Sequence, residues 1–122
     1  MIGGGMGAVC RYSISALAAK YLGTRFPWGT LIANLAGCFM IGIIFALLDR
    51  TRFLSPLMRL FFMTGFLGAL TTFSTYALEV VQAARAGADT SAFLNFALHN
   101  IGGVFFVICG MWMTQLILNV SE

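Results

Sequence analysis

Four long apolar blocks, separated by short charged or turn-forming pieces, run the length of the chain. The second block, 28–48, and the fourth, 90–118, contain no charged side chain. About 20 consecutive apolar residues are enough for a helix to cross a bilayer. The pattern predicts an all-α membrane protein whose residues 1–122 form a single four-helix transmembrane domain, with helices at about 3–22, 28–48, 56–82 and 90–118.

The composition supports a protein embedded in lipid. Sixty per cent of the residues are hydrophobic, only 9% are charged, and the mean hydropathy is +0.93. Soluble domains carry about 25% charged residues. The net charge of +3 is small and spread out, so no nucleic-acid partner is expected. The N-terminus lacks a basic region before an apolar run, so a cleaved signal peptide is not expected.

Lysine and arginine are divided evenly between the two sides of the predicted bundle. Arg50, Arg52 and Arg59 fall on one side, and Lys20, Arg25 and Arg85 fall on the other. An excess of these residues on one side normally fixes the orientation of a membrane protein. An even division therefore favours insertion both ways round, and with it an antiparallel homodimer.

Small residues indicate where the predicted helices approach one another closely. Gly29, Ala33 and Gly37 recur every four residues in the second block, and Gly3 and Gly7 do so in the first. Such small faces let helix backbones come together in membranes. We therefore expect a tight bundle with little interior volume.

Hydroxyl groups are concentrated in the middle of the third block. Five of the six residues from Thr71 to Tyr76 carry one. Such side chains compete for backbone hydrogen bonds and weaken helices, as do the glycines at 65 and 68 just before them. The pattern predicts a break in the third helix near residues 68–76. A broken helix exposes carbonyls that can hold a cation and N–H groups that attract an anion.

Further polar residues follow two helical faces within the predicted spans. Thr30, Asn34 and Cys38 share one face, while Asn95, His99 and Gly103 share another. The only carboxylate inside a predicted span is Glu79, whereas cation pathways usually show carboxylates or carbonyl rings. Two aromatic residues, Phe73 and Tyr76, lie within the predicted break three residues apart. Because the edges of aromatic rings carry a partial positive charge, the break favours a small anion over a cation.

Three motifs carry a resemblance to a known family. They are "GGGMGAVCRY" at 3–12, "PWGTLIANLAGCFMIG" at 27–42 and "GFLGALTTFSTYALE" at 65–79. Together they closely resemble the Fluc (CrcB) fluoride channels, in order and over essentially the whole chain. The resemblance implies a channel that passively exports toxic fluoride from the cytoplasm. It also implies an antiparallel, dual-topology homodimer with two pores and a central structural sodium ion that is not transported.

The resemblance also implies roles for individual residues. The sodium ion would be held by the backbone carbonyls of Gly68 and Thr71, and the fluoride pore would be lined by Asn34, Phe73, Ser74, Thr75 and Tyr76. More weakly supported pore or vestibule residues are Thr30, Glu79, Asn95, His99, Gly103 and Arg11. A short chain with no targeting extension fits the plasma membrane of a bacterium, crossed several times.

The sequence departs from the family at several positions. Tyr76 stands where the family has its second phenylalanine, and its hydroxyl needs a partner. The fourth helix presents Asn95, His99 and Gly103 where the family often presents hydroxyls. Arg11 matches a family arginine near the membrane face, where anchoring or a salt bridge is favoured over drawing anions into a vestibule. A second homologous chain sometimes serves as a heterodimer partner, although the even charge division favours a homodimer.

Two other functions remain to be compared with the channel. A small multidrug resistance exporter is also short, four-helical and of dual topology, but it needs a glutamate in the middle of its first helix, where this chain has Arg11. A non-transporting membrane subunit would leave the hydroxyl run unexplained. An enzyme is not expected, because no nucleophile, base and orienting group can be assembled around the single histidine, His99.

Overall fold

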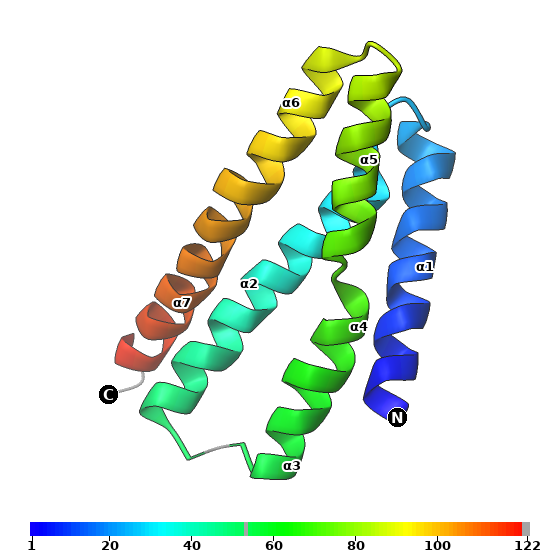
Figure 1. The fold of residues 1–122 in the computed structure, drawn as a ribbon. Helices are drawn as coiled ribbons and strands as arrows, with labels where there is room; N and C mark the ends of the chain where they lie inside the picture. The colour runs from blue at the N-terminus through cyan, green and yellow to red at the C-terminus, as the bar shows by residue number, and fades with distance from the viewer. Residues whose placement is uncertain (53, 121–122) are drawn as a thin grey trace.

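A computed structural model describes residues 1–52 and 54–120 of the protein. These residues form helices and the turns between them, grouped into four rods (Figure 1). The first two rods are α1 (Ile2–Leu22) and α2 (Trp28–Arg50). The third consists of α3 (Pro56–Arg59), the π-helix η1 (Leu60–Leu67), α4 (Gly68–Leu70) and α5 (Phe73–Arg85), and the fourth consists of α6 (Asp89–Ala97), the π-helix η2 (Leu98–Gly102) and α7 (Gly103–Val120).

Three stretches of the described chain are long and apolar enough to cross a membrane. They are Trp28–Arg50, Pro56–Arg85 and Asp89–Asn119. Helix α1 has 21 residues, but its glycines and Arg11 make it less apolar than these three. The protein is therefore an all-helical, multi-pass membrane protein, and a fourth span through α1 stays a prediction.

The helices pack around α2. Helix α2 lies against α7 along much of its length, while α1 packs on α2, η1 and α4, and α5 packs on α6 (Figure 1). The buried core is small and lies where α2 meets the third rod, at Ala33, Leu67 and Leu70. Many large apolar side chains remain exposed in the isolated chain, as expected of helices whose outer faces meet lipid or another chain.

Close backbone contacts explain the predicted small faces. A Cβ added at Gly7 would lie 2.1 Å from the carbonyl oxygen of Phe66, and one at Gly29 would lie 2.6 Å from the Cα of Ser15. Gly37 meets the third rod at Thr71 instead, where an added Cβ would lie 2.2 Å from the side-chain methyl. The expected tight approach is therefore present within a single chain, on both sides of α2.

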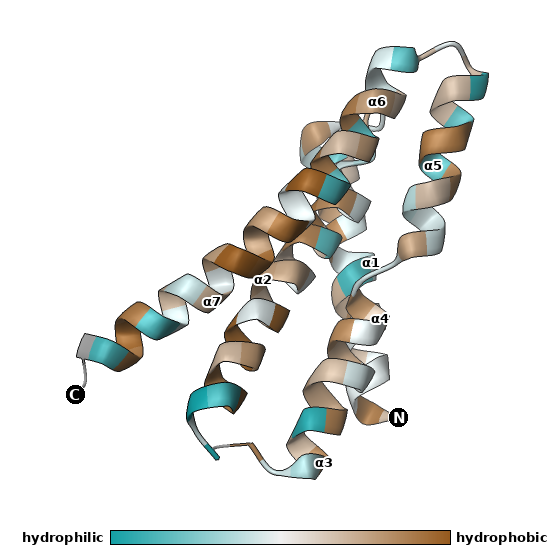
Figure 2. Cartoon of the chain, turned by 60° about the vertical axis from the view of Figure 1, so that its left-hand side comes forward, coloured by the Kyte–Doolittle hydropathy of each residue, from teal (hydrophilic) through white to brown (hydrophobic). Residues whose placement is uncertain are grey.

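The ends of the rods carry the polar sequence. Pro56 opens the third rod behind Ser55, whose hydroxyl accepts a hydrogen bond from the Met58 N–H at 3.3 Å, the N-cap arrangement that a serine before a proline favours. The start of α1, the α2–α3 connection and the end of α7 lie at one end of the bundle, and the α1–α2 and α5–α6 connections lie at the other (Figure 1). Figure 2 shows apolar colouring along most of α2 and α7, with hydrophilic segments near their ends. The two groups of basic residues therefore lie at opposite ends, as the predicted helix order requires.

Candidate functional site

The third rod is interrupted at Thr71 and Thr72. Helix α4 ends at Leu70, both threonines have extended backbone angles, and α5 begins at Phe73 (Figure 1). The interruption therefore lies inside the segment 68–76 in which the sequence predicts it. It is short because the Thr71 N–H still bonds the Leu67 carbonyl at 3.0 Å and Thr72 already caps the next helix.

Asn34 of α2 replaces the backbone partners that Thr72 loses at the interruption. Its Oδ1 accepts a hydrogen bond from the Thr72 N–H at 2.7 Å, and its Nδ2 donates to the Thr72 carbonyl at 3.1 Å. In an uninterrupted helix that N–H would bond the carbonyl of Gly68. Asn34, the predicted pore asparagine, thus bridges the interruption structurally. One of its two amide hydrogens is used in the bond to the Thr72 carbonyl.

The interruption releases both carbonyls to which the family resemblance assigns the sodium ion, those of Gly68 and Thr71. Gly68 loses its helical donor because the Thr72 N–H is bonded to Asn34. Thr71 loses the Thr75 N–H, which donates to the Thr72 hydroxyl at 3.3 Å instead. Such carbonyls carry the negative end of the helix dipole and are hard oxygen donors of the kind that group 1 and 2 cations accept.

The start of α5 has the opposite character. Thr72 is its N-cap, and its hydroxyl also lies 3.0 Å from that of Thr75 and 3.5 Å from that of Ser74. The N–H groups of Phe73 and Ser74 occupy the first turn, where backbone donors lack helical acceptors. Phe73 is 78% exposed, and Ser74 and Thr75 are exposed beside it. This helix end presents donors and hydroxyls on an open face of the isolated chain.

Two aromatic rings continue the site into the bundle. The rings of Phe73 and Tyr76 meet edge-on, with centroids 5.5 Å apart and planes at 64°. The ring of Tyr76, only 6% exposed, stacks on that of His99 at 4.2 Å. The Tyr76 hydroxyl accepts a hydrogen bond from Nδ2 of Asn100 at 2.8 Å. The hydroxyl of Tyr76 therefore has the partner that its sequence position demands.

A cavity of about 400 Å³, which we call the break cavity, lies at this level. Its lining joins the interruption to the aromatic group, and includes Asn34, Cys38, Gly68, Thr71, Thr72, Phe73, Tyr76, His99 and Asn100. Both released carbonyl residues and the predicted ring residues therefore border the same space.

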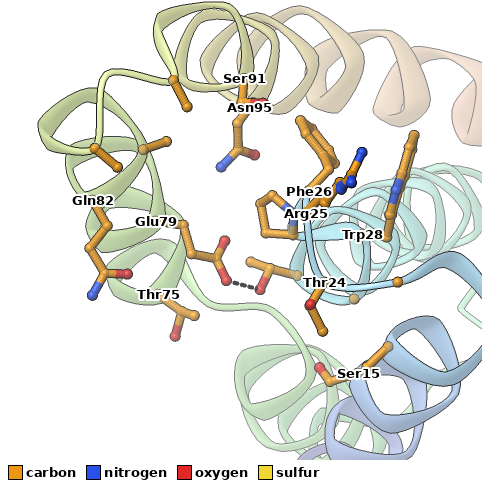
Figure 3. Close-up of a pocket in the computed structure, with 18 residues that line it drawn as sticks. Ser15, Thr24, Arg25, Phe26, Trp28, Thr75, Glu79, Gln82, Ser91 and Asn95 are labelled. Carbon is orange, nitrogen blue, oxygen red and sulfur yellow. Dashed lines mark hydrogen bonds between the residues drawn. The ribbon is translucent and has the colours of Figure 1, made fainter.

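A second cavity, of about 620 Å³, lies towards the α1–α2 connection; we call it the end cavity. Figure 3 shows the side chains of Glu79, from α5, and Asn95, from the neighbouring α6, pointing into it. The Thr30 hydroxyl donates to Oε1 of Glu79 at 2.6 Å. Among the described residues, the other oxygen of Glu79 and both amide atoms of Asn95 lack a hydrogen-bond partner, although Asn95 is 1% exposed.

The two cavities follow one another along the same helices. On α2 the lining passes from Thr30 in the end cavity to Asn34 in the break cavity, and on the fourth rod it passes from Asn95 to His99. His99 joins the two levels, since its Nδ1 donates to the Asn95 carbonyl at 3.0 Å while its ring stacks on Tyr76. Polar residues from three rods thus form a continuous series through the apolar bundle.

Two predicted residues lie apart from this series. Gly103 faces α2, where an added Cβ would lie 3.4 Å from the Cys38 sulfur, and it serves helix packing. Arg11 lies near the middle of α1 and is partly buried, outside the lining of both cavities. The structure therefore does not bring Arg11 or Gly103 to the other candidate residues.

Two residues of the site, Thr72 and Asn100, were not among those predicted individually; Thr72 belongs to the predicted hydroxyl run, whereas Asn100 was missed altogether. A regular α-helix turns successive residues about 100° apart, so Asn100 is not on the predicted Asn95–His99–Gly103 face. The wider π-helix η2 changes that spacing, and both His99 and Asn100 contact Tyr76. The sequence did offer one signal for Asn100, because it is a polar side chain inside the apolar block 90–118, where polar residues are costly and often functional.

Together, the fold and the site define an all-helical membrane protein in which a helix interruption opens onto polar cavities. The family model described as "CrcB-like protein, Camphor Resistance (CrcB)" matches residues 1–111. The chain belongs to this CrcB family.

Relatives named "Fluoride-specific ion channel FluC" cover most of the chain. That of Acidobacterium capsulatum is 44% identical, over 90% of this chain and 88% of its own length. That of Salinibacter ruber is 44% identical over 89% of this chain and 81% of its own, and that of Leptospira interrogans is 38% identical over 93% and 89%. The resemblance seen in the three motifs is thus confirmed along nearly the full chain.

Proposed function

We propose that the protein is a fluoride-selective channel that exports fluoride passively from the cytoplasm. The observation that carries the proposal is the interruption of the third rod, which places a helix N-terminus, three neighbouring hydroxyls and two ring edges together within the membrane-spanning stretch Pro56–Arg85. The names of the relatives supply the ion.

The chemistry of this group suits a small, strongly hydrogen-bonding anion. Backbone donors at the start of α5 and the hydroxyls of Ser74 and Thr75 can replace part of the water around fluoride. Ring edges of Phe73 and Tyr76 add weak positive potential at little desolvation cost. A larger anion such as chloride would gain less from the same donors, because its charge is more diffuse.

The route proposed for the anion passes from the end cavity to the break cavity. Polar groups buried without partners are costly, so the free atoms of Glu79, Asn95 and His99 support a pathway that holds water or ions. Thr30 steadies one oxygen of Glu79 and so limits the negative charge that faces the anion. In this proposal Gly103 and Arg11 contribute to packing and anchoring.

We further propose an antiparallel homodimer with one pore along each subunit. The even division of basic residues between the two ends favours both orientations in the membrane. A second copy would also cover apolar side chains that are exposed in the single chain, above all Phe73. Such a dimer belongs in the plasma membrane of a bacterium.

A structural sodium ion fits the residues at the interruption. The carbonyls of Gly68 and Thr71 have both lost their helical donors, and both residues border the break cavity. Bound there, sodium would supply a fixed positive charge that offsets the carbonyl dipoles at the end of α4.

Replacing Phe73 tests the ring contribution directly. Phe73→Ile keeps an apolar side chain but removes the ring edge, and we expect fluoride efflux from reconstituted liposomes to fall at least tenfold while the dimer still assembles. Phe105→Ile, which removes an exposed ring from α7 away from both cavities, is the matched control. Equal efflux from both variants would contradict the proposed pore.

A further inference from the structure

The hydroxyl of Tyr76 is held in a defined state by its neighbours. Nδ2 of Asn100 lies 2.7 Å from the Phe96 carbonyl and 2.8 Å from the Tyr76 oxygen. A carbonyl oxygen can only accept, so the atom facing Phe96 must be the amide nitrogen. That nitrogen has two hydrogens, and the second one is directed to Tyr76.

The Tyr76 oxygen is therefore the acceptor in its contact with Asn100. A phenol has a single hydrogen, which lies close to the plane of the ring and can point to either side of the oxygen. Because the Asn100 side is occupied by an incoming N–H, the Tyr76 hydrogen points the other way. It remains available as a donor next to the break cavity, which both residues line.

The ring of Tyr76 is also prevented from turning. His99 stacks on one face at 4.2 Å with an interplanar angle of 28°, and Phe73 meets the ring edge-on. The side chain is 6% exposed, so little space remains for another rotamer. The position of the hydroxyl is thus fixed by packing, and the direction of its hydrogen is fixed by Asn100.

We infer that Asn100 is a positioning residue that aims the Tyr76 hydroxyl as a hydrogen-bond donor to the permeating anion in the break cavity. The inference rests on the proposed fluoride channel and deepens it at one site. It assigns to this chain a hydrogen-bond donor to the anion, the Tyr76 hydroxyl, which a phenylalanine at position 76 could not supply. Asn100 of η2 is the residue that orients this donor.

The test uses the full chain reconstituted as the homodimer, with Tyr76→Phe, Asn100→Leu and the double variant. Initial efflux rates are measured over a series of internal fluoride concentrations. Hydrogen bonds to charged groups contribute about 1.5–3 kcal/mol, so Tyr76→Phe should raise the half-saturating fluoride concentration at least tenfold. Asn100→Leu should raise it in the same direction, and the double variant should match Tyr76→Phe, because Asn100 acts only through the hydroxyl.

Matched controls separate this role from simple packing. Tyr21→Phe removes an exposed hydroxyl from the end of α1, and Asn119→Leu removes an amide near the end of α7. Neither should change the half-saturating concentration. An unchanged half-saturating concentration in Tyr76→Phe would overturn the inference, and so would additive effects of the two substitutions.

A second readout separates failure of this inference from failure of the channel. In detergent, fluoride should raise the midpoint of thermal unfolding of the unsubstituted protein relative to an equal concentration of chloride, by mass action on the folded state. Tyr76→Phe and Asn100→Leu should both lose most of that rise. Loss of the rise in both variants supports the inference even if no efflux is observed, whereas an equal rise in all three proteins overturns it.

Discussion

Asn34 supplies the hydrogen bonds that the backbone of Thr72 loses at the interruption. A backbone that leaves the helix at Thr72 loses one donor and one acceptor inside an apolar bundle, where unpaired groups are costly. An asparagine amide offers the same donor and acceptor as a peptide group, and Asn34 bonds both backbone groups of Thr72. Only asparagine and glutamine carry an amide group, which supplies the donor on one atom and the acceptor on another in the arrangement of a peptide group.

Asn34→Leu should therefore destabilise the protein. The substitution keeps the approximate volume but leaves the Thr72 N–H and carbonyl without their partners, at a cost of about 2 kcal/mol or more. The loss is measured as a change in the free energy of unfolding in detergent. Asn119→Leu, which breaks the exposed bond from Arg50, should cost less than about 1 kcal/mol. Equal losses in the two variants would show that the bridge does not support the interruption.

At the scale of elements, the interrupted rod depends on its close contact with α2. Gly37 lies against the methyl group of Thr71, at the point where α4 ends. A Cβ at position 37 would lie 2.2 Å from that methyl, well inside van der Waals contact, so one of the two segments would have to shift. The location of the interruption is thus fixed by packing as well as by hydrogen bonding.

This contact gives a prediction with its own rescue. Gly37→Ala should lower stability and efflux, although alanine is the better helix former by about 1 kcal/mol. Thr71→Ser removes the overlapping methyl but keeps the hydroxyl that donates to the Leu67 carbonyl. The double variant Gly37→Ala/Thr71→Ser should therefore recover most of the lost stability and most of the lost efflux. Gly5→Ala, where an added Cβ meets nothing within 4 Å, is the control and should be neutral or stabilising. A double variant no better than Gly37→Ala would contradict this account.

The elements show which features a sequence pattern can predict. The interruption was predictable because hydroxyls and glycines weaken a helix locally. The N-cap at Ser55 was predictable because a serine before a proline favours one local geometry at a helix start. The π-helices were not predictable. The sequence of η1 is almost uniformly apolar, so it has no hydrophobic periodicity that would indicate a wider helical turn. Asn100 was missed because the π-helix η2 brings it to Tyr76 off the regular helical face, and the bridge from Asn34 to Thr72 depends on contacts between distant segments.

At the scale of the whole molecule, the even distribution of basic residues is the central feature. Arg52 and Arg59 are exposed at one end of the bundle, and Arg25 and Arg85 are exposed at the other. An equal number at each end gives neither orientation an advantage during insertion. The proposed antiparallel dimer needs both orientations in one membrane. Variants with unbalanced charges should therefore still fold but should no longer assemble into that dimer on their own.

Two matched double variants test this dependence. Arg52→Gln/Arg59→Gln and Arg25→Gln/Arg85→Gln each leave one basic residue at one end against three at the other, in opposite senses. Labelling of a single terminal cysteine from each side of the membrane should show one dominant orientation for each variant. Efflux should be low for either alone and should return when the two are co-expressed. Full efflux from one variant expressed alone would contradict the antiparallel arrangement.

The most direct test of the central claim is ion efflux from liposomes that contain only the purified chain. Vesicles loaded with fluoride or with chloride are diluted into a solution free of both ions, with a potassium ionophore to balance charge, and each ion is followed with its own electrode. The account predicts rapid release of fluoride and retention of chloride. Retention of fluoride by vesicles that hold an assembled dimer, or release of both ions at similar rates, would contradict it.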